Sequence, residues 1–248
     1  MMKRYLLLLA ALTASGLLSS APVTSASLGS IQYEVRFQGD VVNAKVADAT
    51  IFLERATWNG QKVLHARAAI NAVSVFRLFM NAEYRADSYL VPETREPLYY
   101  MNPIKRAGKV GKFECLYDQE SGKIASEFTR PPADPVLTSF PWDGRTMDLL
   151  SLLQYVRFLD LAKGKSLSMH VLKGGKSVPA VLTSQGPDTE RFPDRTTERF
   201  LLTMTGMGLM ENGAGNKISV WRSAGGDRAL LALEVDLGSG IMVVSIKE

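Results

Sequence analysis

Alternation of apolar and polar positions runs through most of the chain and predicts β-strands. Ile31–Phe37 alternates along its whole length. Such alternation is typical of a half-buried strand, because successive side chains point to opposite faces of a sheet. Four further β-type runs near the C-terminus are bounded by glycine-rich turns, which mark chain reversals. These runs are Arg199–Met204, Lys217–Arg222, Arg228–Asp236 and Gly240–Lys247.

Three pairs of neighbouring runs are predicted to form hairpins. The strongest signal is Asn59-Gly60, which separates residues 49–58 from residues 61–70. Both turn residues tolerate the positive φ angles of a type I′ turn, so Asn-Gly between β-type runs indicates a hairpin. The other two hairpins pair Gly111–Tyr117 with Lys123–Thr129 and Ser166–Leu172 with Ser177–Thr183.

One segment has the periodicity of a helix. Within Thr146–Leu161, apolar side chains recur at the i, i+3, i+4, i+7 spacing of an amphipathic helix. They are Leu149, Leu152, Leu153, Val156 and Leu159. Thr146 is expected to cap the start of the helix, and Gly164 follows its end.

Two segments fit neither pattern. The stretch before the helix holds Pro131, Pro132, Pro135 and Pro141, too many for regular structure. It either divides two domains near residue 135 or, as we favour, forms a crossover within one β domain. Asn71–Phe79 is apolar without clean alternation and is interpreted as a short helix or a bent strand.

The first 26 residues have the order of a secretory signal peptide. A positive start is followed by the apolar stretch Tyr5–Leu18 and by small residues that end at Ala26, where we expect cleavage. The alternative is a membrane anchor, but the stretch is shorter than the roughly 20 residues of a spanning helix. We therefore predict a signal peptide at 1–26, a single β-rich domain at 27–248, and a periplasmic location.

Composition excludes several function classes. Removal of the signal peptide lowers the formal charge from +4 to +2, and the basic residues are scattered, which argues against nucleic-acid binding. Cys115 is the only cysteine, so the chain has no internal disulfide, and its alternating neighbours predict a small buried side chain. His65 and His170 lie too far apart in sequence for known zinc motifs, so no metal or cofactor is expected.

The most suggestive apolar group contains Met204, Met207, Leu209 and Met210. Methionine is flexible and polarizable, so it suits surfaces that fit varied apolar ligands, although core filling beside a turn remains open. We include Arg157 and Trp221 in the candidate ligand-binding set. If Arg157 is buried, its expected partner is Asp87 or Asp227, and such a pair is more often structural than functional.

Three ordered segments resemble the bacterial family of domain of unknown function 3108. They are Tyr84–Pro92, Met147–Asp160 with the following Gly164, and Ile218–Ser223 with Asp227-Arg228. The resemblance implies an exported β-rich protein of a Gram-negative envelope and implies no reaction. In fold, the pattern is similar to the curved sheets of periplasmic lipoprotein carriers, which wrap a helix over an apolar concavity.

These observations predict a mostly β fold, a single antiparallel β-sandwich or curved open barrel with one packed amphipathic helix. The leading functional hypothesis is a non-enzymatic periplasmic binding or carrier module for an apolar envelope molecule, a lipid or glycolipid. A second is a hydrolase of envelope glycans or esters that uses His65 or His170 with Asp87 or Asp227. A third is a structural partner in an envelope assembly that binds through a sheet edge.

Overall fold

The computed structural model describes residues 26–40, 42–73, 83–106, 109–129, 132–205 and 216–247. Within these ranges the chain forms fifteen strands and one α-helix, α2 (Leu149–Phe158). The first eight strands are β1 (Ala26–Gln38), β2 (Asn43–Trp58), β3 (Gln61–Ala72), β4 (Glu83–Leu90), β5 (Pro97–Arg106), β6 (Lys109–Asp118), β7 (Lys123–Thr129) and β8 (Val136–Pro141). The other seven are β9 (Thr146–Met147), β10 (Ser166–Lys173), β11 (Lys176–Asp188), β12 (Thr197–Met204), β13 (Lys217–Ser223), β14 (Leu230–Asp236) and β15 (Ile241–Ile246).

All of these strands belong to one sheet whose order follows the chain. Strands β1 to β8 form a first antiparallel meander, and β10 to β15 form a second. Antiparallel pairing of β1 with β15 joins the two meanders, while the short β9 pairs with β10 in parallel. The sheet therefore ends at β8 on one side and at β9 on the other, although these two strands are consecutive in the chain.

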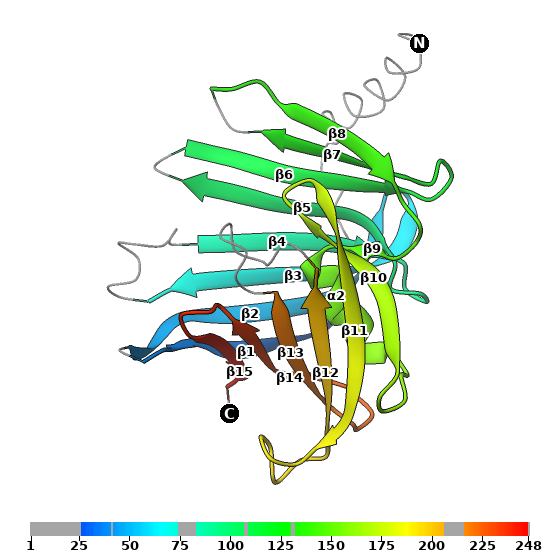
Figure 1. Ribbon diagram of the computed structural model, residues 1–248. Coiled ribbons are helices and arrows are strands. Elements are labelled where there is room, and N and C mark those ends of the chain that lie inside the picture. The colour runs from blue at the N-terminus through cyan, green and yellow to red at the C-terminus, as the bar shows by residue number, and fades with distance from the viewer. Residues whose placement is uncertain are drawn as a thin grey trace.

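The sheet is strongly curved and open. In Figure 1, strands β3 to β8 run across the view, whereas β10 to β13 run up the view in front of them, with α2 between the two groups. The mostly β fold with one packed helix is confirmed, and of the two predicted forms the sheet adopts the curved, open one. No helix in the described part of the chain has the length and apolar character needed to cross a membrane.

The predicted hairpins are confirmed. Asn59 and Gly60 have φ angles of 49° and 77°, as a type I′ turn requires, and Trp58 pairs with Gln61 across them. Strands β6 and β7 pair over the predicted second hairpin, and β10 and β11 over the third.

The helix is shorter than predicted, and its cap is a different residue. Thr146 does not cap the helix, because it lies in β9 and pairs with His170 of β10. The cap is Asp148, whose extended backbone leaves its side chain free to accept a hydrogen bond from the backbone N–H of Ser151. The periodic pattern found the apolar face of the helix but not its first turn.

The prediction that the proline-rich stretch has no regular structure is wrong at its end. Residues 136–141 form β8, the last strand on one side of the sheet. An edge strand tolerates proline because one row of its backbone groups has no partner to lose. Of the ambiguous segment Asn71–Phe79, the first two residues complete β3, and residues 74–79 lie outside the described residues.

Two apolar clusters fill the concave side. The larger one packs β1, β2 and β10 to β14 against α2, with Val156, Phe200 and Leu202 fully buried. The smaller one lies inside the first meander and includes Cys115 and Leu150 of the helix. Cys115 is thus the buried small side chain that the sequence predicts, and burial raises the pKa of its thiol.

Candidate functional site

The N-terminal end of α2 is fixed by a buried carboxylate. Asp148 accepts hydrogen bonds from the Ser88 hydroxyl at 2.8 Å, from the Ser151 N–H at 2.9 Å and from the Ser151 hydroxyl. Its own backbone N–H donates to the Tyr117 hydroxyl at 3.1 Å. Burial raises the pKa of this carboxyl above its ordinary value. These contacts tie the helix to β4 and β6.

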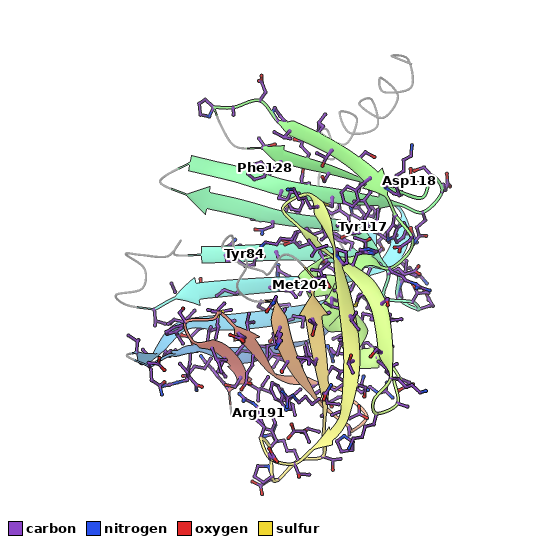
Figure 2. The ribbon with its side chains drawn as sticks, in the orientation of Figure 1. Tyr84, Tyr117, Asp118, Phe128, Arg191 and Met204 are labelled. Carbon is purple, nitrogen blue, oxygen red and sulfur yellow. The ribbon has the colours of Figure 1, made fainter. Side chains whose placement is uncertain are left out.

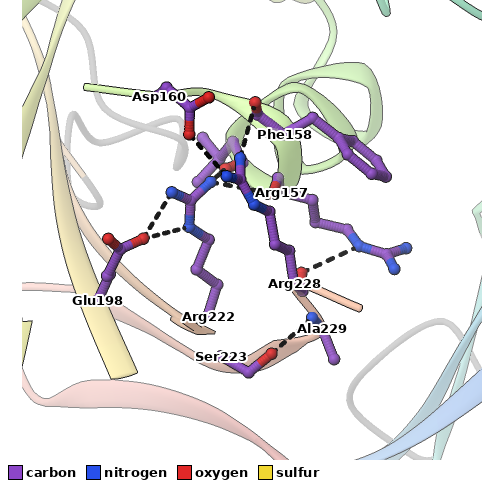
Figure 3. A network of polar contacts seen from close by, with 9 residues as sticks. Arg157, Phe158, Asp160, Glu198, Arg222, Ser223, Arg228 and Ala229 are labelled. Carbon is purple, nitrogen blue, oxygen red and sulfur yellow. Dashed lines mark hydrogen bonds and ion pairs between the residues drawn. The ribbon is translucent and has the colours of Figure 1, made fainter. Parts of the chain in front are cut away.

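The C-terminal end of α2 is fixed by arginines from the second meander (Figure 3). Arg222 of β13 is 2% exposed and donates to the carbonyls of Val156 and Arg157. It also pairs with Glu198 of β12 at 2.5 Å. Arg228 donates to the carbonyl of Phe158 at 3.1 Å. Positive groups at this end offset the negative pole of the helix dipole.

Arg157 leaves the helix at the same end and contacts the turn between β13 and β14. Its guanidinium donates to the carbonyls of Arg228 and Asp227 at 3.2 and 3.1 Å, and to the Gln154 side chain at 3.1 Å. Arg157 therefore contacts the predicted partner Asp227 through its backbone carbonyl. The Asp227 carboxylate accepts a hydrogen bond from the Ser223 hydroxyl instead. The other predicted partner, Asp87, lies on β4 against His65.

A cleft of about 370 Å³ opens beside α2, between the β4–β5 turn and strands β9 and β10. Tyr155 of the helix forms one wall, and the β4–β5 turn contributes Thr94 and Glu96. Met147 and Met169 are each 3% exposed and form the floor. The remaining lining residues are Asp143, Gly144, Arg145 and Leu167. The site combines an apolar floor with a charged rim, the composition expected for an amphipathic ligand.

His170 lines a smaller neighbouring cleft of about 200 Å³, together with Asp143, Arg145 and Ser168. Its Nδ1 lies 3.7 Å from the Asp143 carboxylate, and no hydrogen bond to this nitrogen is found within the described residues. Ser168 shares the cleft, but no hydrogen bond joins it to His170 in the described part of the chain. Ser168 and His170 therefore do not form a contacting pair of nucleophile and base in the described residues.

His65 is engaged on both sides. Its Nδ1 lies 2.9 Å from the Glu54 carboxylate and its Nε2 lies 2.7 Å from that of Asp87. The ring also stacks on Tyr89 with centroids 4.5 Å apart. Both ring nitrogens face carboxylates, and the residue links β2, β3 and β4.

The predicted ligand-binding residues do not gather at one place. Met204 is 2% exposed within the larger core, at the upper end of β12 in Figure 2. Met207, Leu209 and Met210 lie outside the described residues.

Trp221 lies in a separate cluster, apart from Met204. The tryptophan is 3% exposed, donates to Asp188 at 3.0 Å, and lies under the guanidinium groups of Arg191 and Arg199. Figure 2 shows Arg191 near the lower end of the second meander, away from Met204 at its upper end. Trp221 is therefore enclosed by protein groups on this side of the sheet.

Sequence reasoning missed the residues that line the larger cleft. Met147 and Met169 are far apart in the chain and were not distinguished from other apolar positions. The cleft forms because β9, α2 and β10 meet the β4–β5 turn, and that meeting depends on which strands end the sheet. The only available signal was the position of Met147 directly before the helical pattern.

The chain belongs to the protein family of unknown function DUF3108, whose model matches residues 32–246. The resemblance inferred from the three ordered segments is thus confirmed. No curated protein matches the sequence. Among solved structures, the chain is similar to a β-barrel-like protein of domain of unknown function DUF1849 from Brucella abortus, at 7% identity and a TM-score of 0.43. That similarity covers 88% of this chain and 95% of the other.

Proposed function

We propose that this DUF3108 protein is a non-enzymatic binding or carrier module that is exported to the periplasm and holds an amphipathic envelope molecule, a lipid or glycolipid. The observation that carries the proposal is the cleft beside α2. Its methionine floor can adapt to an apolar chain, since thioether side chains are flexible and polarizable. Its volume of about 370 Å³ suits a single chain or a small head group.

The rim of the cleft supports an amphipathic rather than a purely apolar ligand. Arg145 and Asp143 are exposed at the mouth, and Glu96 lines the opposite side. A few polar groups around an apolar floor orient a ligand and leave its head group in contact with water. The proposal of export rests on the signal-peptide pattern of residues 1–26. The first strand starts at Ala26, so the expected cut would spare nearly all of it.

Mass spectrometry of the protein purified from the periplasm tests this function, first under native conditions and then after organic extraction. The informative variant is Leu167→Glu, because Leu167 lines the cleft and is only half-buried. The matched control is Ile241→Glu, which adds the same charge at a side chain that is 41% exposed in β15. We expect a bound lipid or glycolipid in the wild type and the control, and its loss from Leu167→Glu.

Three outcomes would contradict the proposal. Detection of the wild type from the periplasm at the mass of the protein alone, without a bound molecule, would argue against a carrier function. Equal ligand retention by a folded Leu167→Glu variant would show that any bound molecule lies elsewhere. Hydrolysis of model esters by the wild type but not by a His170→Ala variant would favour the hydrolase hypothesis instead.

A second candidate function, pairing of two copies through a sheet edge, is favoured by β8. This strand ends the sheet, carries no charged residue, and exposes Val136 and Leu137 by 56% and 48%. Edge strands are usually protected by charges, so an uncharged exposed edge is suited to strand pairing. Antiparallel pairing centred on Thr138 would place Val136 of each copy opposite Phe140 of the other, with no like charges in contact.

Cysteine substitutions test this pairing. In the register centred on Thr138, Thr138→Cys places two thiols opposite one another across the two-fold axis and yields a disulfide-linked dimer on oxidation. Ser139→Cys is the matched control, since its partner in that register is Leu137. Monomeric Thr138→Cys after oxidation, or equal cross-linking of both variants, rejects the pairing.

A further inference from the structure

The β4–β5 turn holds an arginine in an unfavourable backbone conformation. Arg95 has a φ of 64°, in the left-handed region that residues other than glycine seldom occupy. The turn is closed by hydrogen bonds from Arg95 N to Val91 O and from Val91 N to Glu96 O, both 2.9 Å long. Strain of this kind often marks a functional position, because the surrounding structure must maintain it.

The Arg95 side chain gains little from its protein neighbours. Its guanidinium lies over the Phe158 ring, 4.3 Å from the centroid. Its buried Nε has no hydrogen-bond partner among the described residues. Burial and the nearby charge of Arg157 lower the pKa of Arg95, while Glu93 acts in the opposite direction without forming an ion pair in the described part of the chain. The guanidinium therefore keeps donors that the described residues leave unused.

Arg157 approaches the same aromatic ring. Its guanidinium lies 5.4 Å from the Phe158 centroid, and its donors contact two backbone carbonyls and an amide oxygen rather than a carboxylate. Burial lowers the pKa of Arg157. The acid in the contacted turn is Asp227. Its carboxylate accepts hydrogen bonds from the Ser223 hydroxyl and from the backbone N–H of Ala229.

The other arginines at this end of the helix are each matched by an acid. Arg222 pairs with Glu198 at 2.5 Å, and Arg228 pairs with Asp160 at 2.7 Å. These two residues also occupy the last carbonyls of α2, so the negative end of the helix is already compensated. Arg95 and Arg157 remain as two neighbouring guanidinium groups that no carboxylate of the described residues contacts.

We propose that Arg95 and Arg157, whose guanidinium groups lie 4.3 and 5.4 Å from the centroid of the Phe158 ring, form a binding site for an oxyanion of the phosphate or carboxylate class. Guanidinium groups bind such anions through paired, charge-assisted hydrogen bonds. The anion is a free phosphate or the head group of the ligand in the neighbouring cleft. The second source rests on the proposed function, since Thr94, Glu96 and Tyr155 line that cleft beside the two arginines.

Calorimetric titration of the purified protein with inorganic phosphate and with dihexanoyl phosphatidic acid tests the site. The decisive variant is Arg95→Gln, which removes a guanidinium that forms no hydrogen bond with the described residues. Arg55→Gln is the control, because Arg55 is exposed on β2 and the substitution changes the charge equally. We expect Arg95→Gln to weaken binding of both probes at least about tenfold and Arg55→Gln to leave both unchanged.

The inference is overturned if neither probe binds the wild type, or if Arg95→Gln and Arg55→Gln lose affinity equally.

The two probes also identify the source of the anion. Phosphatidic acid that binds at least about tenfold tighter than phosphate, and loses this gain in Leu167→Glu, marks the anion as a ligand head group. Equal affinities in the wild type mark a free anion. Phosphatidic acid binding that needs Leu167 but not Arg95 rejects the anion site and leaves the cleft proposal intact. Phosphate binding that needs Arg95, without any gain in affinity from the acyl chains, supports the anion site and argues against the cleft proposal.

Discussion

The two ends of helix α2 are held by opposite chemistry. At the N-terminal end, one buried carboxylate accepts hydrogen bonds from hydroxyl and backbone groups, and both Ser88 and Ser151 are fully buried. At the C-terminal end, arginines converge from β13, from the turn after it and from the β4–β5 turn. Several of these arginines remain half-buried or reach the surface.

The difference indicates which end is structural and which has capacity for a ligand. The Ser88 hydroxyl and the Ser151 hydroxyl and N–H all donate to Asp148 in a space closed to water, so this end has one function, which is to fix the helix. At the other end, Arg222 and Arg228 already donate to the last carbonyls of the helix. Arg95 and Arg157 are not required for that capping. A charged group that stability does not require is a candidate for function.

The largest expected effect is at the N-terminal end. Asp148→Ala removes the helix cap and leaves the buried Ser88 hydroxyl and Ser151 N–H without their acceptor. We expect a loss of about 3 kcal/mol in the free energy of unfolding, from the cap and the unpaired groups together. Urea denaturation followed by circular dichroism measures it. The control, Asp143→Ala, removes an exposed carboxylate, and an equal loss there would show that the buried network has no special weight.

The same carboxyl gives stability a distinctive dependence on pH. Burial raises the pKa of Asp148 in the folded protein above 3.8, so the folded state binds this proton more tightly than the unfolded state does. The contribution of Asp148 to stability is therefore greatest at low pH and falls as pH rises through the folded pKa. We expect Asp148→Asn to become more stable relative to the wild type as pH rises from about 4 to about 7.

Asp118, in the β6–β7 turn, supplies a control of opposite sign. Hydrogen bonds from the Ser121 hydroxyl and backbone lower the pKa of its carboxyl, so its contribution is present above the ordinary pKa and is lost as pH falls. Asp118→Asn should therefore lose stability relative to the wild type as pH rises from about 2 to about 5 and change little above that. Parallel pH profiles for the two variants would contradict the contrast.

At the C-terminal end, we expect a smaller loss from Arg222→Met. Methionine retains the apolar stem, but the carbonyls of Val156 and Arg157 lose their donor and Glu198 loses its partner. Because Glu198 is 35% exposed and can be hydrated, we expect a loss of about 2 kcal/mol, less than for Asp148→Ala. The same denaturation measurement ranks the two. A larger loss for Arg222→Met would reverse the assignment of the structural end.

The sequence predicted the fold well because local patterns set most of it. Asn59-Gly60 determines a hairpin by backbone preference alone, and a meander needs little more than a series of such turns. The errors come instead from long-range pairing. Thr146 and Asp148 are both good caps, and only the pairing of Thr146 with β10 decides between them. The proline-rich stretch could become a strand because β8 lies at an edge, which the sequence does not reveal.

The candidate sites depend on contacts that no local pattern encodes. The sequence singled out Arg157 as an unusual charge on an apolar helix, but the position of Arg95 beside it follows from the β4–β5 turn. Met147 and Met169 form one floor because β9 pairs with β10 in parallel, in the register of Met147 with Val171. Single-sequence reasoning has no means to find these long-range contacts.

The smallest expected change in stability is for a variant of Arg95, and it tests the comparison of the two helix ends most directly. Arg95→Gly removes a guanidinium that contacts Phe158 but relieves a left-handed backbone conformation, which costs about 1 kcal/mol in a residue with a side chain. The two terms nearly cancel, so we expect a change of less than about 1 kcal/mol in the free energy of unfolding. A loss as large as that of Arg222→Met would make Arg95 a structural residue like the caps. Near-unchanged stability, combined with weakened phosphate binding, would mean that an arginine is retained in a strained turn for what it binds.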